Sequence, residues 1–447
     1  MRTLIVGHGG RESALASRMA EHSELYAFAG HLNPSLVRYT DASGGKLQLG
    51  DVCDAQAVAA FAREHEIDIA MISADEPLEA GVVDELLAQG TAAVGPTRAG
   101  AEIEWNKAFA RELLAEVAPE ATPQLRVIRS AGEVDDAIAS FGATPVVVKP
   151  SGLTGGKGVK VMGPHLASHA DAGDYARSLL AGTKPSSSVL IEQKIVGAEF
   201  TIQAISDGKT VVFPASTYDY PFRFDGDEGP GTGGMGSLTS AAPILPFMEP
   251  EHYAQACSIV ERVIERLGAE GRRFTGVMNS GFFATADGVQ VIEFNARFGD
   301  PECMNIMSLL DGSWPHAMER ICAGSLTTAD VPLSSDASLV LYLVSPDYAL
   351  PARAGAGPTP YEFELDVAAI EQARCEVFFS SAVHVAGDTY RTVGTSRAVA
   401  LATTATTLGA AHERIVERAS SVGVLQWRRD VGDERYLDGL RELVRSG

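Results

Sequence analysis

Residues 291–302 read Val-Ile-Glu-Phe-Asn-Ala-Arg-Phe-Gly-Asp-Pro-Glu, an apolar strand that continues into alternating polar residues. Because successive side chains of a strand point to opposite faces, Glu293, Asn295 and Arg297 are expected to project together. A carboxylate and an amide oxygen suit magnesium, and a planar guanidinium suits phosphate. The segment by itself also fits a solvated strand edge whose charges pair with neighbours. We interpret it as one side of a nucleotide site that uses a metal ion.

A second segment strengthens the nucleotide hypothesis. Residues 146–150 (VVVKP) predict a buried strand with Lys149 near its end, and residues 151–159 (SGLTGGKGV) follow as a glycine-rich loop. Glycines let backbone N–H groups approach phosphate oxygens, and lysines add positive charge. The loop lacks the GK[ST] ending of a Walker motif. Together with the strand at 293–297 it predicts an ATP site.

Composition is typical of a cytoplasmic enzyme. The chain has 447 residues, of which 45% are hydrophobic and 21% charged, so a multidomain globular protein is expected. No apolar run approaches the length of a membrane span, and we expect no signal peptide. The excess of 58 acidic over 36 basic residues gives a net charge of −22, which disfavours nucleic acid and membranes as partners. The five scattered cysteines predict reduced thiols rather than disulfides or zinc.

The first hundred residues alternate between predicted strands and helices. This βαβ alternation predicts a doubly wound parallel sheet, with ligands bound beyond the carboxyl ends of its strands. Strands are expected at 3–7, 24–30 and 68–74, and helices at 11–22, 54–66 and 80–90.

Several segments resemble the phosphoribosylamine–glycine ligase family of the ATP-grasp superfamily. The resemblance rests on SGLTGGKGVKV (151–161), DGDEGPGTGGMGS (225–237) and VIEFNARFGDPE (291–302). It continues in GHGGRESALA (7–16), ADEPLEAGVVDEL (74–86), WNKAFARELL (105–114) and WRRDVG (427–432). The segments follow the family's order from the first strand to nearly the last helix. The resemblance implies an ATP-dependent ligase that joins glycine to 5-phosphoribosylamine through an acyl phosphate, in purine synthesis.

The resemblance also implies roles for individual residues. For ATP it implies phosphate contacts from Lys107, Lys149, Gly155, Gly156 and Lys157, an adenine-holding linker at Glu192, Lys194 and Ile195, and a ribose contact from Glu199. For the metal, Mg²⁺ or Mn²⁺, it implies Glu293 and Asn295, and for catalysis Arg297, Asp219 and Lys149. For the small-molecule substrates it implies Gly9, Arg11, Glu12, Asp219 and Asp300. Two of these residues also have an ordinary interpretation: Glu199 as an exposed strand residue, and Asp300 as the cap of the next helix.

The family's fold, combined with the local patterns, divides the chain into four parts. We expect a doubly wound domain at 1–100 on the phosphoribosylamine side, an ATP-grasp core at 101–122 and 191–328, its lid at 123–190, and a mostly antiparallel C-terminal domain at 329–447. Within these parts the patterns predict a helix at 101–115, two strands within 186–208, and a long glycine-rich loop at 214–237. Strands are expected at 337–346, 375–385 and 389–405, followed by a helix at 407–422.

The sequence departs from the family on the substrate side. Where the family has cations after its aspartate, this chain reads Tyr218, Asp219, Tyr220, Pro221, Phe222, and only the neighbouring Arg223 could take their place. Further differences lie at Ser73-Ala74-Asp75, Gly231, Asn279 and residues 378–381 (FFSS). The segments expected to bind ATP keep their charged residues. An apolar pocket at 218–222 would favour a bulkier or less charged substrate.

Three alternatives therefore stay open beside glycine ligation. The first is a related ligase with a different amine or acid, and the second is a nucleotide-binding protein without turnover. The third is an oxidoreductase that binds a dinucleotide at GHGGR, but residues 30–33 (GHLN) lack the acidic ribose-binding residue that this requires. We expect a monomer or a small homo-oligomer.

Overall fold

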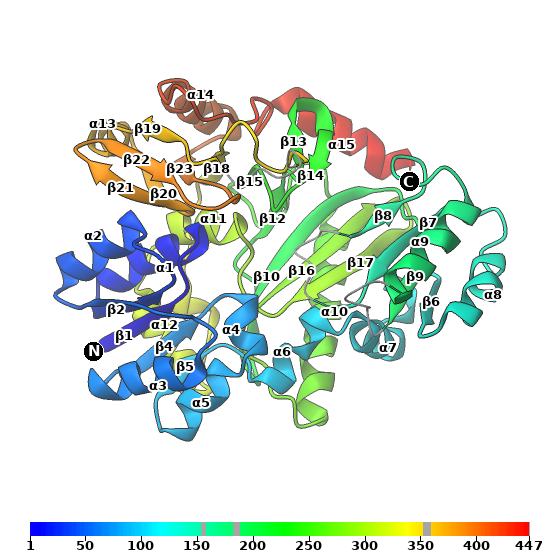
Figure 1. Ribbon diagram of the computed structural model, residues 1–447, viewed down its shortest axis with the longest axis horizontal. Coiled ribbons are helices and arrows are strands. Elements are labelled where there is room, and N and C mark those ends of the chain that lie inside the picture. The colour runs from blue at the N-terminus through cyan, green and yellow to red at the C-terminus, as the bar shows by residue number, and fades with distance from the viewer. Residues whose placement is uncertain (153–157, 182–187, 352–358, 447) are drawn as a thin grey trace.

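The first ninety-odd residues form a parallel sheet between helices (Figure 1). The computed structural model describes residues 1–152, 158–181, 188–351 and 359–446. The strand order β3-β2-β1-β4-β5 places β1 at the centre, as in a doubly wound fold. The strands are β1 Arg2–Val6, β2 Glu24–Ala29, β3 Leu47–Leu49, β4 Ile69–Ile72 and β5 Ala92–Val94. The helices are α1 Gly10–Ala20, α2 Pro34–Ser43, α3 Ala55–Glu64, α4 Asp75–Glu79 and α5 Val82–Ala88.

The helix expected at 101–115 is in fact two helices. These are α6 Arg98–Trp105 and α7 Lys107–Val117, and Asn106 separates them. The Asn106 side chain accepts a hydrogen bond from the backbone N–H of Phe109 at 3.1 Å, which caps α7. Asparagine favours such an N-cap over a helix interior, so the single-helix prediction was wrong at this residue.

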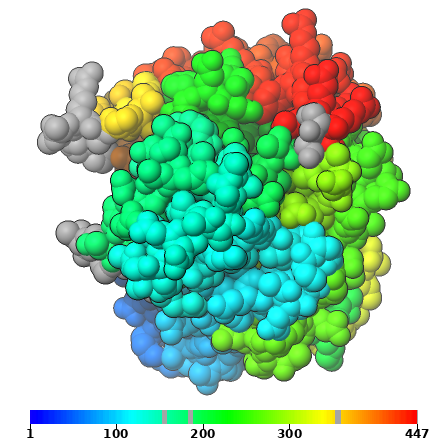
Figure 2. Space-filling model, turned by 90° about the vertical axis from the view of Figure 1, so that its right-hand side faces the viewer, coloured from blue at the N-terminus to red at the C-terminus, as the bar shows by residue number. Residues whose placement is uncertain are grey.

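A small four-stranded sheet follows, in the order β6-β9-β7-β8. Its strands are β6 Leu125–Ile128, β7 Val146–Pro150, β8 Lys160–Val161 and β9 Val189–Gln193, and its helices are α8 Val134–Ala139 and α9 His169–Ala181. Its buried side chains form an apolar cluster distinct from the large core of the molecule. In Figure 2 these cyan to blue-green residues form the front of the molecule. The expected division at 190/191 falls inside β9.

The remaining strands build one large antiparallel sheet. Its order in the described part of the chain is β17-β16-β10-β12-β15-β18-β23-β20, with β11 paired to β10. The first strands are β10 Ala198–Asp207, β11 Val211–Val212, β12 Ser216–Asp219 and β15 Gly236–Thr239. The others are β16 Thr275–Thr285, β17 Gly288–Asn295, β18 Ala337–Leu343, β20 Cys375–Phe379 and β23 Val399–Ala405. Strands from both sides of the expected division at 328/329 therefore share one sheet, and the domain limits stay predictions.

The glycines of segment 214–237 predicted a loop, and this prediction was wrong because the segment consists mainly of strands. It forms β12, β15 and, between them, the hairpin β13 Phe222–Phe224 with β14 Glu228–Gly231. Tyr218 pairs with Leu238 across β12 and β15, so backbone pairing in the large sheet outweighs the low strand preference of glycine.

The C-terminal strands are shorter than predicted. The expected strand 375–385 is divided into β20 and β21, and the expected strand 389–405 into β22 and β23. Strands β21 and β22 leave the large sheet and form a separate sheet with β19, in the order β19-β22-β21. Its strands are β19 Glu362–Glu364, β21 Ala382–Ala386 and β22 Thr389–Thr392. The remaining helices are α10 Pro250–Ala269, α11 Glu302–Leu309, α12 Trp314–Ala323, α13 Val367–Gln372, α14 Leu408–Ala419 and α15 Glu434–Ser446. No described helix is both long and apolar enough to span a bilayer.

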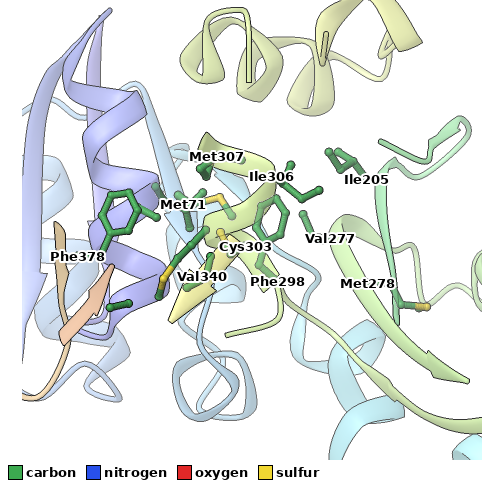
Figure 3. Packing of buried hydrophobic residues seen from close by; sticks show 14 of the residues in the cluster. Met71, Ile205, Val277, Met278, Phe298, Cys303, Ile306, Met307, Val340 and Phe378 are labelled. Atoms are coloured by element: carbon green, nitrogen blue, oxygen red, sulfur yellow. The ribbon is translucent and has the colours of Figure 1, made fainter. Parts of the chain in front are cut away.

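Helix α11 packs between the first parallel sheet and the two halves of the large antiparallel sheet. Figure 3 shows its side chains Cys303, Ile306 and Met307 between Met71 and Phe378 on one side and the strand of Val277 on the other. Helix α1 approaches so closely that a Cβ on Gly10 would lie 2.3 Å from the Tyr342 hydroxyl and 2.5 Å from the Met304 methyl. A larger residue at position 10 would therefore force the Tyr342 and Met304 side chains to shift.

Shortening an α11 side chain should destabilise the whole molecule. Ile306 is fully buried, so Ile306→Ala removes apolar contacts and leaves a cavity. We expect the free energy of unfolding to fall by about 2–5 kcal/mol. Urea denaturation followed by circular dichroism measures it, with Leu87→Ala on the exposed face of α5 as control. Equal effects of the two substitutions would contradict a central role for α11.

Candidate functional site

The end of β17 presents the three polar side chains that the sequence singled out. Glu293 is exposed and Asn295 and Arg297 are half-buried, whereas the alternate residues Phe294 and Ala296 are buried. Asn295 Nδ2 donates to Glu293 Oε1 at 3.5 Å, and Arg297 Nη2 donates to Asn295 Oδ1 at 3.3 Å. The three side chains thus form a row on one face, as expected.

A carboxylate that sequence reasoning missed holds this row in place. Glu104, at the end of α6, pairs with Arg297 at 2.9 Å and accepts the backbone N–H of Ala296 at 2.8 Å. Burial raises the pKa of Glu104, while the positive charge of Arg297 opposes this shift. The available signal was its position just before the quoted segment 105–114.

Across from the row, three charged residues bind one another in the interior. Glu192 on β9 is 2% exposed and contacts Lys149 Nζ on β7 at 2.7 Å and Arg111 Nε on α7 at 2.6 Å. Burial opposes the charge of Glu192, yet the two cations lower its pKa to about 2. Arg111 is a second residue that sequence reasoning missed.

These groups line one pocket. Its charged walls are Glu104, Lys107, Arg111, Lys149, Glu192 and Glu293, and its apolar walls include Ile103, Leu190, Ile292 and Phe294. An apolar slot with a few convergent charges is the usual form of a small-ligand site. Residues from three predicted groups, those for phosphate, adenine and metal, are therefore neighbours in space.

Glu199 on β10 interacts electrostatically with Glu293. Burial, followed by Glu293 and Asp227, raises the pKa of Glu199 to about 7. Lys194 and Ile195 lie in the turn between β9 and β10, where the backbone N–H of Lys194 donates to Pro145 O at 2.8 Å. Gly155, Gly156 and Lys157 lie outside the described residues.

Asp219, at the end of β12, faces a second carboxylate. Burial and the neighbouring Glu302 raise the pKa of Asp219 well above its ordinary value. Burial also raises the pKa of Glu302, at the start of α11, while Arg297 lowers it. Glu302 is buried and Asp219 half-buried, and such an acidic pair suits a cationic ligand group. Glu302 was not among the residues chosen from the sequence.

The aromatic residues beside Asp219 point elsewhere. Tyr218 and Tyr220 are buried against α15, where the Tyr218 hydroxyl lies 2.5 Å from that of Tyr436. Alternation along the strand therefore directs Asp219 to one face and the tyrosines to the other. The expected apolar substrate pocket at 218–222 is not formed by these two side chains.

Arg223 does not take the place of the missing cations. It is 1% exposed, and its Nη2 donates to Gln426 Oε1 at 2.7 Å while its Nε donates to Tyr348 O at 3.2 Å. Burial lowers the pKa of Arg223. Its donors bind groups in the C-terminal part of the chain. The hypothesis that Arg223 takes the place of the family's cations is therefore wrong for this structure.

Asp300 lies between cations and does not cap α11. Its carboxylate contacts Arg397 Nη2 at 3.2 Å and accepts the Tyr342 hydroxyl at 2.6 Å. Burial opposes the charge, but Arg397 and then Arg11 lower the pKa of Asp300. The N-cap of α11 is Pro301, without a side-chain bond, so the capping interpretation was wrong. Arg397, missed from the sequence, also donates to Gly234 O at 3.0 Å.

The three residues expected in the first glycine loop bind one another. Glu12 accepts the backbone N–H of Gly9 at 2.7 Å and Arg11 Nε at 2.7 Å. Arg11 Nη1 donates to Phe298 O at 3.0 Å, which joins the loop to the end of the 291–302 segment. The loop therefore lies beside Asp300, at the carboxyl edge of the first sheet.

Comparison with known proteins gives matches over the whole chain. Residues 1–104 match the phosphoribosylglycinamide synthetase N domain, and residues 105–303 match the ATP-grasp (A) domain of the same family. A phosphoribosylamine–glycine ligase of Thermococcus kodakarensis is 37% identical over 100% of this chain and 99% of its own. One from Methanothermobacter thermautotrophicus is 37% identical over 98% of each chain.

Solved structures share the fold at lower sequence identity. A phosphoribosylamine–glycine ligase from Thermotoga maritima gives a TM-score of 0.77 at 22% identity, covering 96% of this chain and 100% of its own. The biotin carboxylase domain of 2-oxoglutarate carboxylase from Hydrogenobacter thermophilus, solved with MgADP and bicarbonate, gives 0.69 at 14% identity, covering 98% and 95%.

The environment of Glu199 predicts a pH-dependent stability. Its pKa of about 7 exceeds the ordinary value of 4.5, so the folded chain binds a proton in this range that the unfolded chain lacks. The resulting stability is fully present below the ordinary value and is lost as the pH rises through 7. Raising the pH from about 5 to about 8 should therefore lower the thermal midpoint of the parent more than that of Glu199→Gln. Exposed Glu251→Gln is the control, and an unchanged pH dependence in Glu199→Gln would contradict the assignment.

Proposed function

Because the chain belongs to the phosphoribosylamine–glycine ligase family, we propose that it joins glycine to 5-phosphoribosylamine with ATP. The products are glycinamide ribonucleotide, ADP and phosphate, as a step of de novo purine synthesis. The observation that carries the proposal is one pocket in which Lys107 and Lys149 face Glu293, beside the Asn295–Arg297 row.

The proposed reaction has two steps. A carboxylate is a poor electrophile, so the γ-phosphoryl of ATP first passes to a glycine carboxylate oxygen and ADP leaves. The amine lone pair of phosphoribosylamine then attacks the acyl carbon, the bond from that carbon to the phosphate oxygen breaks, and the amine loses a proton. Both steps gather negative charge, which Arg297, Lys107 and Lys149 neutralise in this proposal. Lys157, Gly155 and Gly156 complete the proposed phosphate contacts.

The remaining nucleotide contacts follow from the same pocket. Adenine would lie in the apolar slot beside Glu192, with the backbone of Lys194 and Ile195 along its edge. Glu199 would accept a ribose hydroxyl, and its closeness to Glu293 would bring the ribose and the phosphates to neighbouring positions.

Glu293 and Asn295 are suited to a divalent metal. Both offer hard oxygen atoms, and Glu293 is exposed. No cluster of three or more acidic, histidine or cysteine side chains among the described residues could hold a metal alone, so phosphate and water oxygens would supply the other ligands. Bound there, Mg²⁺, or Mn²⁺ in its place, would neutralise the phosphates of ATP.

The substrates would lie between the sheet and the first glycine loop. Asp219, together with Glu302, would hold the ammonium group of glycine, since two neighbouring carboxylates in a largely buried site stabilise one cation. Gly9, Arg11, Glu12 and Asp300 would face phosphoribosylamine at the carboxyl edge of the first sheet. Because Tyr218 and Tyr220 pack on α15, they do not form the apolar pocket that would favour a bulkier acid over glycine.

The proposal extends to the setting of the enzyme. With a net charge of −22 the chain would act on small molecules rather than on nucleic acid or membranes. We further propose that it works in the cytoplasm, as a monomer or a small homo-oligomer.

Two experiments test the substrates. Release of ADP should require glycine and phosphoribosylamine together, measured with each supplied and omitted in turn. Expression of the chain should also allow a strain lacking its own glycinamide ribonucleotide synthetase to grow without purines. Failure of well-expressed protein in both experiments would point to a ligase with another amine or acid.

Removing the charge of Glu293 should abolish most of the activity. Glu293→Gln keeps the shape of an exposed side chain, so the fold should survive while turnover falls by about two orders of magnitude or more. The rate of ADP release at saturating ATP measures this loss, and Glu251→Gln is the control. Near-normal release by folded Glu293→Gln would refute the metal assignment.

A further inference from the structure

Arg111 connects the small four-stranded sheet to the large one. From α7 its guanidinium contacts both oxygens of Glu192, with Nε at 2.6 Å and Nη2 at 2.9 Å. The same group donates from Nη1 to Val291 O and from Nη2 to Ile292 O, each at 2.9 Å, on β17. Arg111 is 5% exposed, so these bonds are formed away from water. The planar fork of arginine suits such a bidentate contact.

Lys149 is bound to the carboxylate that Arg111 holds. Its Nζ lies 2.7 Å from Glu192 Oε2, and the Lys149 side chain is 15% exposed. In this position its charge is directed at Glu192, whereas phosphate binding needs that charge for the nucleotide. Removing one partner of a buried ion pair strands the other charge, which is strongly unfavourable. Without another cation at Glu192, Lys149 could leave only at that energetic cost.

We propose that Arg111 is a positioning residue that keeps Glu192 paired while Lys149 moves from Glu192 to a nucleotide phosphate. Arg111 holds the Glu192 carboxylate at the small sheet. Through its bonds to the two β17 carbonyls, Arg111 also fixes the distance between Glu192 and the proposed metal-binding strand. Glu192 Oε2, released by Lys149, then becomes an acceptor for the exocyclic amine of the base. This inference rests on the proposed function, since it requires ATP in this pocket.

The other described charged groups that line the pocket do not neutralise Glu192. Lys107 lines the pocket, yet it forms no ion pair with Glu192 in the described structure. Glu104 is committed to Arg297, and Glu293 and Glu199 are negative. Arg111 is thus the one cation, among the described residues, that binds Glu192 besides Lys149.

A double-variant cycle tests the role of Arg111. The Kd of a β,γ-imido analogue of ATP with Mg²⁺ is measured by calorimetry on the full chain, without glycine or phosphoribosylamine. Arg111→Met should raise the Kd about tenfold or more, a change of about 1.4 kcal/mol, because Lys149 must then stay with Glu192. In a Glu192→Gln background the same substitution should change the Kd less than about threefold, since a neutral glutamine has no need of Lys149.

Arg126→Met on the exposed edge of β6 is the matched control and should leave the Kd unchanged. Thermal melting checks the fold of each variant. If Arg111→Met does not fold, Arg111→Lys, which keeps the charge but loses the fork, is compared in both backgrounds by the same criterion.

The outcomes separate this inference from the proposed function. If Arg111→Met weakens binding equally in the parent and in Glu192→Gln, Arg111 is a structural clamp only and the inference is overturned. An unchanged Kd when Arg111→Met is made in the parent, which keeps Glu192, would also overturn it. Absence of analogue binding by the unsubstituted chain would instead refute the ATP site itself.

Discussion

One carboxylate, Asp300, joins the three parts of the chain on which the site depends. It follows strand β17, contacts Arg397 of the C-terminal part at 3.2 Å, and lies close enough to Arg11 of helix α1 for that cation to lower its pKa. Tyr342 adds a hydrogen bond of 2.6 Å. A largely buried carboxylate is destabilised when its cations are removed, so Asp300 couples the three parts energetically.

The same rule governs the rest of the site. In a chain with a net charge of −22, any phosphate site needs local cations, and three of the cations at this site are held by buried acids. Glu104 holds Arg297, and Glu192 holds Lys149 and Arg111. Pairing keeps the cations in place and keeps the interior neutral. Asp219 and Glu302 are the exception, because they form an acidic pair suited to the cationic end of a substrate.

The C-terminal segment supports the site from behind. Arg428, fully buried, contacts Asp227 at 2.9 Å and Asp430 at 2.6 Å, and Tyr436 donates to Asp227 at 2.7 Å. These bonds fasten the turn of the β13–β14 hairpin to α15. Tyr218 and Tyr220, which precede the positions where Pro221 and Phe222 stand in place of the family's cations, therefore contribute to packing on α15, and Asp219 between them projects to the other face of β12.

The sequence by itself determined what depends on local periodicity. Alternation placed Glu293, Asn295 and Arg297 on one face, and the apolar run ending in Lys149 predicted the buried strand β7. It also predicted the parallel first sheet. It failed at Asn106, where a cap divides a helix, and at 214–237, where glycines concealed strands, one of which (β15) pairs with β18 about a hundred residues later.

Only the tertiary structure decided which charges meet. Glu104, Arg111, Glu302 and Arg397 come from separate elements, and no periodic pattern relates them to Arg297, Glu192, Asp219 or Asp300. Likewise Arg223 is adjacent to the altered segment in sequence, yet its donors bind carbonyl and amide oxygens near residues 345–348 and 426. Local sequence sets the face on which a side chain projects, whereas its partner depends on long-range packing and on the free-energy penalty for leaving a buried charge unpaired.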